Sequence, residues 1–99
     1  MADSQFGRFL ELQTETERQH IEFLKTEVQT GFTFMDVART ELASGDLPHA
    51  ERALAGAGSA FHVILARLPA LLPAMTAQER HWFEENMKQF GASLKNFPK

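Results

Sequence analysis

The 99-residue chain contains no cysteine, no tyrosine, one tryptophan and four prolines. Without cysteine it forms no disulfide and offers no thiolate to a metal ion or as a nucleophile. Its aromatic content comes almost entirely from nine phenylalanines. Because a buried phenylalanine brings no hydroxyl group that needs a hydrogen-bond partner, this set suits a plain apolar core.

Positive charge is also scarce. Ten Lys and Arg residues are scattered among 13 Asp and Glu residues, and the net charge is −3. Nucleic-acid binding depends on a basic surface that neutralises phosphates, so we expect no nucleic-acid partner. The polar faces of the predicted helices are acidic or mixed rather than rich in lysine, which argues against a helix lying on a membrane.

Long apolar runs are missing as well. The longest, between Phe61 and Met75, is interrupted by Arg67 and two prolines. We therefore expect no helix that spans a bilayer and no membrane partner. Met1 is followed by polar residues without an apolar segment, which predicts that there is no secretory signal. Together with the lack of cysteine, this favours a cytoplasmic protein.

The composition of the chain is that of one folded domain. Apolar residues make up 43% of the chain and charged residues 23%, close to the averages for globular proteins. A chain of this length buries roughly 65% of its unfolded surface, which is enough for one core. No polar linker divides it, so we interpret residues 1–99 as a single domain.

The clearest local signal is a pair of apolar stripes on either side of a break at residues 44–48. Gly45 suits the end of a helix because it adopts a positive φ without penalty. Asp46 is a candidate N-cap, and Pro48 fits a first helical turn. Both stripes have the alternating steps of three and four that predict a helical hairpin. Their members are Ile21, Leu24, Val28, Met35, Ala38 and Leu42 before the break, and Leu47, Ala50, Leu54, Ala57, Phe61, Ile64 and Leu68 after it.

The first helix of the hairpin is predicted to be long. Two positions allow a break: Thr14, which begins a candidate capping box with Glu17, and Gly31, which lies within the apolar stripe. The spacing favours one continuous helix of about 40 residues, or ~60 Å. A break near Thr14 or Gly31 would make four helices instead of three.

The second helix is expected to run from Pro48 to about Arg67, because Pro69 disfavours helical geometry at Leu68. An apolar connector over residues 68–73 follows, and we expect Leu71 and Leu72 to cover one end of the core. One face of this helix carries only small residues, which predicts a close approach of helix backbones. These close-packing residues are Ala53, Gly56, Ala57 and Ala60.

The last helix is predicted to start at Thr76, whose capping box is completed by Glu79, and to end before Pro98. Its apolar stripe repeats the helical spacing of the first two. The predicted fold class is therefore all-α, an antiparallel three-helix bundle with a long first helix.

The sequence contains no complete catalytic set, so we expect a protein that is not an enzyme. Glu17 and His20 have the E-x-x-H spacing of di-iron bundles, but in that order the motif occurs once. His81 and Glu84 offer the reverse order on the last helix. The favoured interpretation is a surface neighbourhood of Glu and His, with no metal or cofactor. The alternative is a metal- or small-ligand-binding bundle that uses Glu17 and His20 with His81 and Glu84.

More aromatic residues are present than the predicted stripes require. Most of them are expected in the core, and the others would form an exposed patch for a partner. A long helix that overhangs two shorter ones also leaves an end that a second chain can cover. We therefore predict a non-enzymatic protein that acts through contact with another protein or with a second copy of itself. The candidate surface residues are Phe6, Phe9, Leu10, Phe23, Phe34 and Trp82.

Residues 34–62 resemble a single tetratricopeptide-type helical hairpin. Phe34, Val37 and Ala38 occupy the aromatic, aliphatic and small positions of that motif, and residues 45–46 occupy its turn. In the second helix, Ala50, Leu54 and Ala57 follow its small, large, small pattern. The chain departs from the motif at Glu41, where an aromatic residue is usual, and at His62, where a proline is usual. The resemblance implies a protein-binding role.

Overall fold

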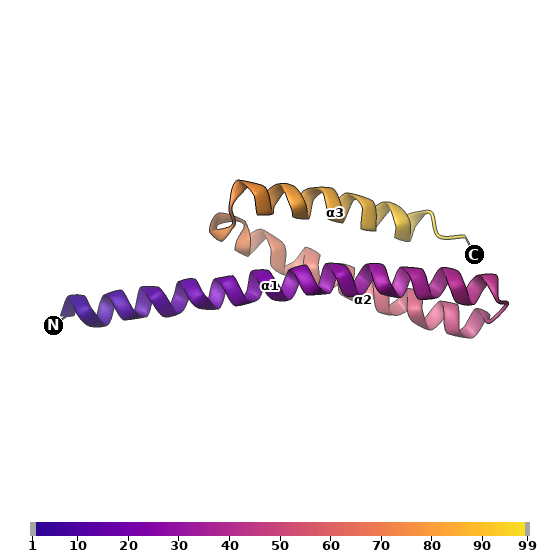
Figure 1. Cartoon of the computed structure of the whole chain (residues 1–99), viewed down its shortest axis with the longest axis horizontal. Helices are drawn as coiled ribbons and strands as arrows, with labels where there is room; N and C mark the ends of the chain where they lie inside the picture. The colour runs from indigo at the N-terminus through magenta and orange to yellow at the C-terminus, as the bar shows by residue number, and fades with distance from the viewer. Residues whose placement is uncertain (1, 99) are drawn as a thin grey trace.

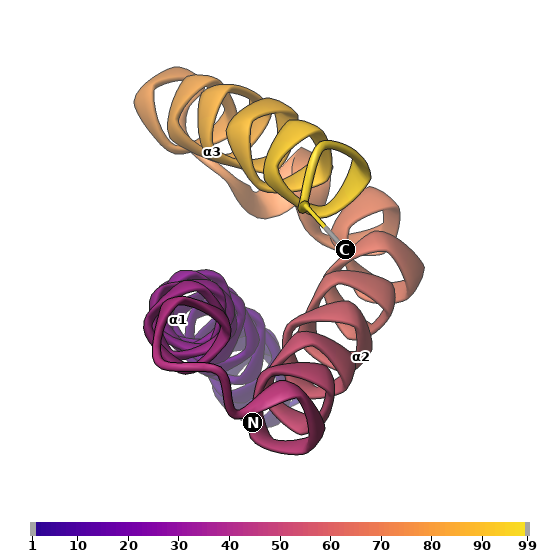
Figure 2. The ribbon, with the colours of Figure 1, turned by 90° about the vertical axis from the view of Figure 1, so that its right-hand side faces the viewer.

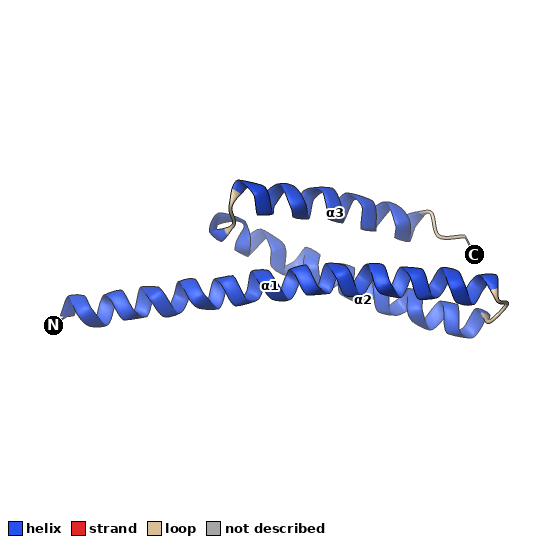
Figure 3. Ribbon diagram, viewed as in Figure 1, coloured by secondary structure: helices blue, strands red, loops and turns tan. Residues whose placement is uncertain are grey.

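The computed structural model describes the backbone of residues 2–98 and the side chains of residues 7, 8 and 10–98. It contains helices α1 (Ala2–Ala43), α2 (Leu47–Leu71) and α3 (Ala77–Lys95), and a short 3-10 helix, η1 (Leu72–Ala74), before α3. No strand occurs within residues 2–98. Each long helix runs antiparallel to the one before it (Figures 1 and 3). The prediction of an all-α, antiparallel three-helix fold is confirmed.

Helix α1 is continuous over 42 residues. The Thr14 hydroxyl donates to the Leu10 carbonyl oxygen at 2.9 Å, a bond within one helical turn, and so does not act as an N-cap. The four-helix alternative is therefore wrong. A helix of this length measures ~63 Å, which accounts for the longest of the molecule's dimensions, 66 × 22 × 16 Å.

The turn between α1 and α2 has the geometry expected from its residues. Gly45 has φ 87°. Its N–H donates to the Leu42 carbonyl at 3.1 Å, and the Asp46 N–H donates to the Glu41 carbonyl at 2.9 Å. These two bonds form a Schellman motif, which satisfies the last carbonyl groups of α1. The Asp46 carboxylate then accepts the His49 N–H at 3.1 Å and caps α2.

Helix α2 does not end near Arg67 as predicted, but continues through Pro69 to Leu71. Proline removes one backbone donor, and the Leu72 N–H restores helical bonding by donating to the Leu68 carbonyl. Burial of Leu71 in the core favours the extra turn. Leu72, which was predicted to cover the core, begins η1 instead and is exposed.

The small-residue face of α2 lies against α1, and these two helices share most of the contacts in the fold. Ala53, Ala57 and Ala60 are buried. At Gly56, an added Cβ would lie 3.0 Å from the nearest atom of the Phe34 ring. The absence of larger side chains on this face lets the two backbones approach closely.

Helix α3 begins with the predicted capping box. The Thr76 hydroxyl accepts the Glu79 N–H at 3.0 Å, and the Glu79 carboxylate accepts the Thr76 N–H at 3.1 Å. The helix ends at Lys95, with Asn96 as its C-cap. It therefore ends three residues before Pro98, the residue predicted to follow its end.

The three helices meet at Phe90 of α3. Its ring centroid lies 5.3 Å from that of Phe32 on α1 and 5.2 Å from that of Phe61 on α2. Gly31 leaves room for this ring, since an added Cβ would lie 2.3 Å from two ring atoms. A view along the helices shows α1, α2 and α3 at three corners of the fold (Figure 2). The largest fully buried side chains are Phe83, Phe90, Ile21, Leu24, Met35, Ile64 and Val28.

Candidate interaction surface

Helix α1 carries a second row of apolar side chains, on a face that the core does not use. Leu12, Phe23, Phe34 and Val37 are 57%, 43%, 37% and 40% exposed. They are spaced by 11, 11 and 3 residues. Because 11 residues make about three helical turns with a drift of only ~20°, all four lie on one face. We call these four residues the outer stripe.

One edge of the outer stripe contacts α2. The Arg67 guanidinium lies 5.6 Å from the centroid of the Phe23 ring, in a cation–π arrangement. The Phe34 ring lies against Gly56. Beside Phe23, a shallow groove is lined by His20, Phe23, Ala66, Arg67, Ala70 and Leu71. The two phenylalanine rings are thus held in place on one side and open to solvent on the other.

The N-terminal part of α1 extends past the other helices. The last contacts with η1 surround a hollow lined by Thr14, Glu17, Arg18, Pro73 and Ala74. Figure 1 shows α1 continuing beyond this point without a neighbour. Leu10, in this part, is 45% exposed. The predicted surface residues Phe6 and Phe9 also belong to it, but they lie outside the described side chains.

Trp82 belongs to a different region of the molecule. Its indole stacks edge-on against Phe83, with ring centroids 4.9 Å apart, and is half-buried. It lines a hollow between α1 and α3 together with Lys25, Gln29, Gln78 and Glu79. The structure therefore separates Trp82 from the outer stripe instead of joining all predicted surface residues into one patch.

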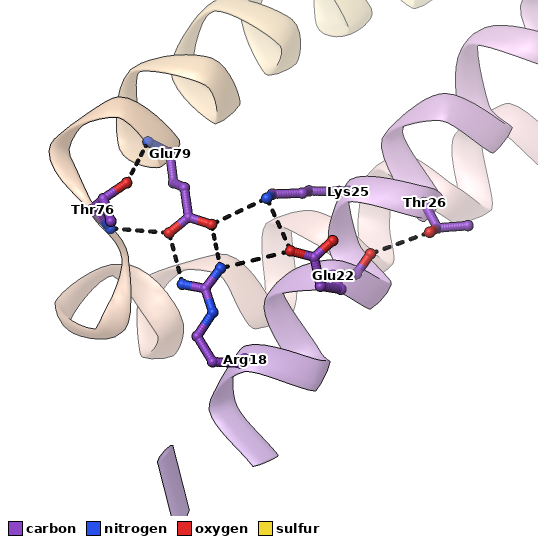
Figure 4. Close-up of polar contacts among 6 residues, drawn as sticks. All are labelled: Arg18, Glu22, Lys25, Thr26, Thr76 and Glu79. Atoms are coloured by element: carbon purple, nitrogen blue, oxygen red, sulfur yellow. Dashed lines mark hydrogen bonds and ion pairs between the residues drawn. The ribbon is translucent and has the colours of Figure 1, made fainter. Parts of the chain in front are cut away.

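A polar cluster fastens α3 to α1 next to this hollow (Figure 4). Arg18 binds the Glu79 carboxylate through both terminal nitrogens, with the Nη1–Oε1 distance 2.8 Å. The Lys25 Nζ lies 3.1 Å from Glu79 Oε2 and 3.0 Å from Glu22 Oε1. Since Glu79 also caps α3, one carboxylate orients the start of that helix and joins it to α1.

The charged groups in this cluster shift one another's pKa values. Hydrogen bonds from Arg18 and from the Thr76 N–H hold the pKa of Glu79 far below its ordinary value, against the opposing effect of desolvation. The pKa of Arg18 is raised chiefly by its bond to Glu79. The pKa of Lys25 is raised chiefly by its bond to Glu22 and then by Glu79. All of these groups are charged at neutral pH and are engaged within the chain.

The structure does not bring the four alternative metal ligands into one cluster. Glu17 is half-buried beside η1, and His20 is exposed in the groove next to Phe23. His81 and Glu84 are exposed on α3. Among the described residues, none of the four belongs to a group of three candidate ligands with atoms within 4.8 Å of one another.

A group with that spacing occurs instead at the turn between α1 and α2, where Glu41, Asp46 and His49 come together. The Asp46 Oδ2 lies 3.1 Å from the His49 Nδ1, and its other oxygen accepts the His49 N–H. These two bonds lower the pKa of Asp46. They also occupy both oxygens of its carboxylate, which is the N-cap of α2. The arrangement is accounted for by capping.

Residues Leu47–Ala74 satisfy the length and composition criteria for a membrane-crossing helix, with mean hydropathy 1.4. This differs from the expectation of no such segment, because α2 continues through Pro69 and into η1. Within its most apolar window, 22% of the residues are buried. A core helix can meet the same criteria, so this finding is weak support for a membrane location.

Part of the exposed apolar surface was not predicted. Leu12, Leu65 and Leu72 are exposed but were not named as surface residues. Leu12 could have been found from its 11-residue distance to Phe23, which equals the distance from Phe23 to Phe34. Leu65 on α2 and Leu72 in η1 carry no such signal, since their exposure depends on where α3 packs.

Comparison with known proteins gives no relative. No family model matches the chain, and searches of curated proteins and of solved structures find no match.

Proposed function

We propose that this is a non-enzymatic helical protein that acts through protein–protein contact, with the outer stripe of α1 as its binding surface. The observation that carries the proposal is the alignment of Leu12, Phe23, Phe34 and Val37 on one exposed face. Single exposed apolar residues are common on protein surfaces, whereas an aligned row indicates a contact site.

Three further features support this proposal. The N-terminal part of α1 has no neighbour along it (Figure 1). The rings of Phe23 and Phe34 are positioned by Arg67 and Gly56 of α2, so that they lose less side-chain freedom when a partner covers them. The tetratricopeptide resemblance of residues 34–62 also implies protein binding and includes two members of the outer stripe.

The test compares two substitutions of equally exposed apolar residues. Phe23→Asp places a charge in the outer stripe, while Leu65→Asp changes a residue that is 48% exposed on α2. Leu65 lies one turn after Phe61, which packs on Phe90 of α3, whereas Arg67 packs on Phe23. The two sites therefore face different sides of the molecule. Circular dichroism would establish that both variants keep the helical content of the parent.

Binding would be measured by affinity capture with the intact chain and by analytical ultracentrifugation. We expect Phe23→Asp to abolish complex formation and Leu65→Asp to preserve it, whether the partner is another protein or a second copy. A parent chain that stays monomeric and captures no protein, or a complex that is insensitive to Phe23→Asp, would contradict the proposal.

A further inference from the structure

We propose that a second copy of this chain covers the outer stripe, with the two α1 helices packed antiparallel and Phe23 at the two-fold axis. This inference rests on the proposed function and names its partner. A symmetric dimer requires one surface that is complementary to itself. The spacing of the outer stripe meets this requirement.

The apolar residues are placed symmetrically about Phe23. Leu12 precedes it by 11 residues and Phe34 follows it by 11. When two copies pack antiparallel about Phe23, Leu12 of each lies level with Phe34 of the other, and Phe23 meets Phe23. Thr16 and Thr30, which lie on the same face, also become level. Leu12, Phe23 and Phe34 then each face an apolar residue, and Thr16 faces Thr30.

Phe23 also lies at the middle of α1, which spans Ala2–Ala43. This register therefore overlaps the two α1 helices along almost their entire length. A contact ~60 Å long and ~10 Å wide, the diameter of a helix, covers ~600 Å² on each chain. The total of ~1,200 Å² reaches the lower limit for a specific interface. The N-terminal part of each α1, which lacks a neighbour in the monomer, lies along α1 of the partner.

Charge favours the antiparallel arrangement over a parallel one. The half-buried Glu27 flanks the outer stripe on the side of α2, and the half-buried Glu41, four residues after Val37, lies on the same face as the stripe. A parallel pair would place Glu27 opposite Glu27 and Glu41 opposite Glu41, which is repulsive. In the antiparallel pair, Glu27 lies level with Gln19 and next to His20. Arg67, stacked on Phe23 and exposed, lies at the rim of the contact.

Because the chain has no cysteine, one introduced cysteine can carry a spin label at a chosen site, and distances between the labels of two copies report the register of the dimer. Single-cysteine variants Thr33→Cys and Thr40→Cys place a spin label at exposed sites beside the outer stripe. With 1.5 Å rise per residue, the antiparallel register separates the two labels along the axis by ~30 Å for residue 33 and by ~51 Å for residue 40. A parallel dimer would instead give equal, short distances of roughly 10–20 Å at both sites, close to the spacing of adjacent helices.

Sedimentation equilibrium on the full chain supplies the second readout. We expect a reversible dimer, a Kd for Phe23→Asp at least about 30-fold weaker because a central aromatic contact is lost, and a change of less than about threefold for Leu65→Asp. Label distances of ~30 and ~51 Å together with this pattern would support the inference.

Three other results would overturn it. Equal short label distances would show a parallel dimer and leave the proposed function intact. A monomeric parent that captures a different protein in a Phe23-dependent manner would exclude the second copy but also preserve the proposed function. A monomer that captures nothing would overturn both.

Discussion

Helices α2 and α3 both lie along α1, but different side chains hold them there. Helix α2 presents small residues, so its backbone approaches α1 closely over a long contact. Helix α3 is attached through a few large side chains, among them the fully buried rings of Phe83 and Phe90 and the carboxylate of Glu79. Stability should therefore be spread over many positions at α2 and concentrated in a few at α3.

The largest effect is expected from Phe90→Ala. This change removes a ring that contacts both α1 and α2 and is fully buried, and the loss should lower the free energy of unfolding by about 3–5 kcal/mol. Phe23→Ala is the matched control. Because Phe23 is 43% exposed, its loss should cost only about 1 kcal/mol. Urea denaturation would measure both, and equal costs would contradict the central role of Phe90.

Gly31→Ala tests the fit around the same ring. The added Cβ would lie 2.3 Å from atoms of Phe90, whose ring is confined by Phe32 and Phe61. We expect a loss of about 1–3 kcal/mol from overpacking, even though alanine is the better helix former. Gly58→Ala is the control, because its Cβ would meet nothing within 4 Å. It should stabilise the protein by about 0.5–1 kcal/mol in thermal or urea unfolding.

Glu79→Gln tests the polar attachment of α3. Glutamine can still cap the helix but loses the charged bonds to Arg18 and Lys25. Because Arg18 is partly exposed, we expect a loss of about 1–2 kcal/mol at pH 7. Glu84→Gln, at an exposed site on the same helix, should change stability by less than about 0.5 kcal/mol.

The stability difference between the parent and Glu79→Gln should also depend on pH. The pKa of Glu79 is lower in the folded protein than in the unfolded chain, so its contribution is present above the unfolded pKa of about 4.3 and is lost as the pH falls below it. The stability difference between parent and Glu79→Gln should be constant between pH 6 and 8 and shrink below about pH 4. A difference that is as large at pH 2 as at pH 7 would show that the carboxylate charge is not its cause.

The smallest effect is expected from Asp46→Ala at the start of α2. Loss of the bond to the His49 N–H should cost about 1 kcal/mol. Asp36→Ala removes a carboxylate that pairs only with exposed Arg39 in the same helix, and it should cost less than about 0.5 kcal/mol. Comparable losses in thermal melts would mean that the cap contributes no more than a surface ion pair.

Much of the fold could be predicted because it depends on local signals. The Gly45–Asp46 turn and the Thr76–Glu79 capping box involve residues a few positions apart, whose bonding follows from backbone geometry. The error at Pro69 has a different origin. A local rule ended α2 at that residue, but burial of Leu71 in the core outweighed the one backbone bond that proline removes.

The candidate site was predicted less completely. Phe23, Phe34 and Leu10 were identified as residues beyond the needs of the main stripe, and they are exposed. Trp82 was grouped with them, but it lines a separate hollow beside Lys25. Whether an apolar residue off the main stripe is covered depends on the direction from which the third helix approaches, and periodicity does not carry that information.

The sequence by itself determined the three helices and the turn between the first two, because spacing and capping act within a few residues. It favoured a continuous α1 but left breaks near Thr14 and Gly31 open. Only the tertiary structure decided that Gly31 receives Phe90 and that Arg18 binds Glu79, 61 residues away. It also decided which apolar face of α1 stays open. Those outcomes depend on the relative placement of whole helices, which is set by the packing of the core as a unit.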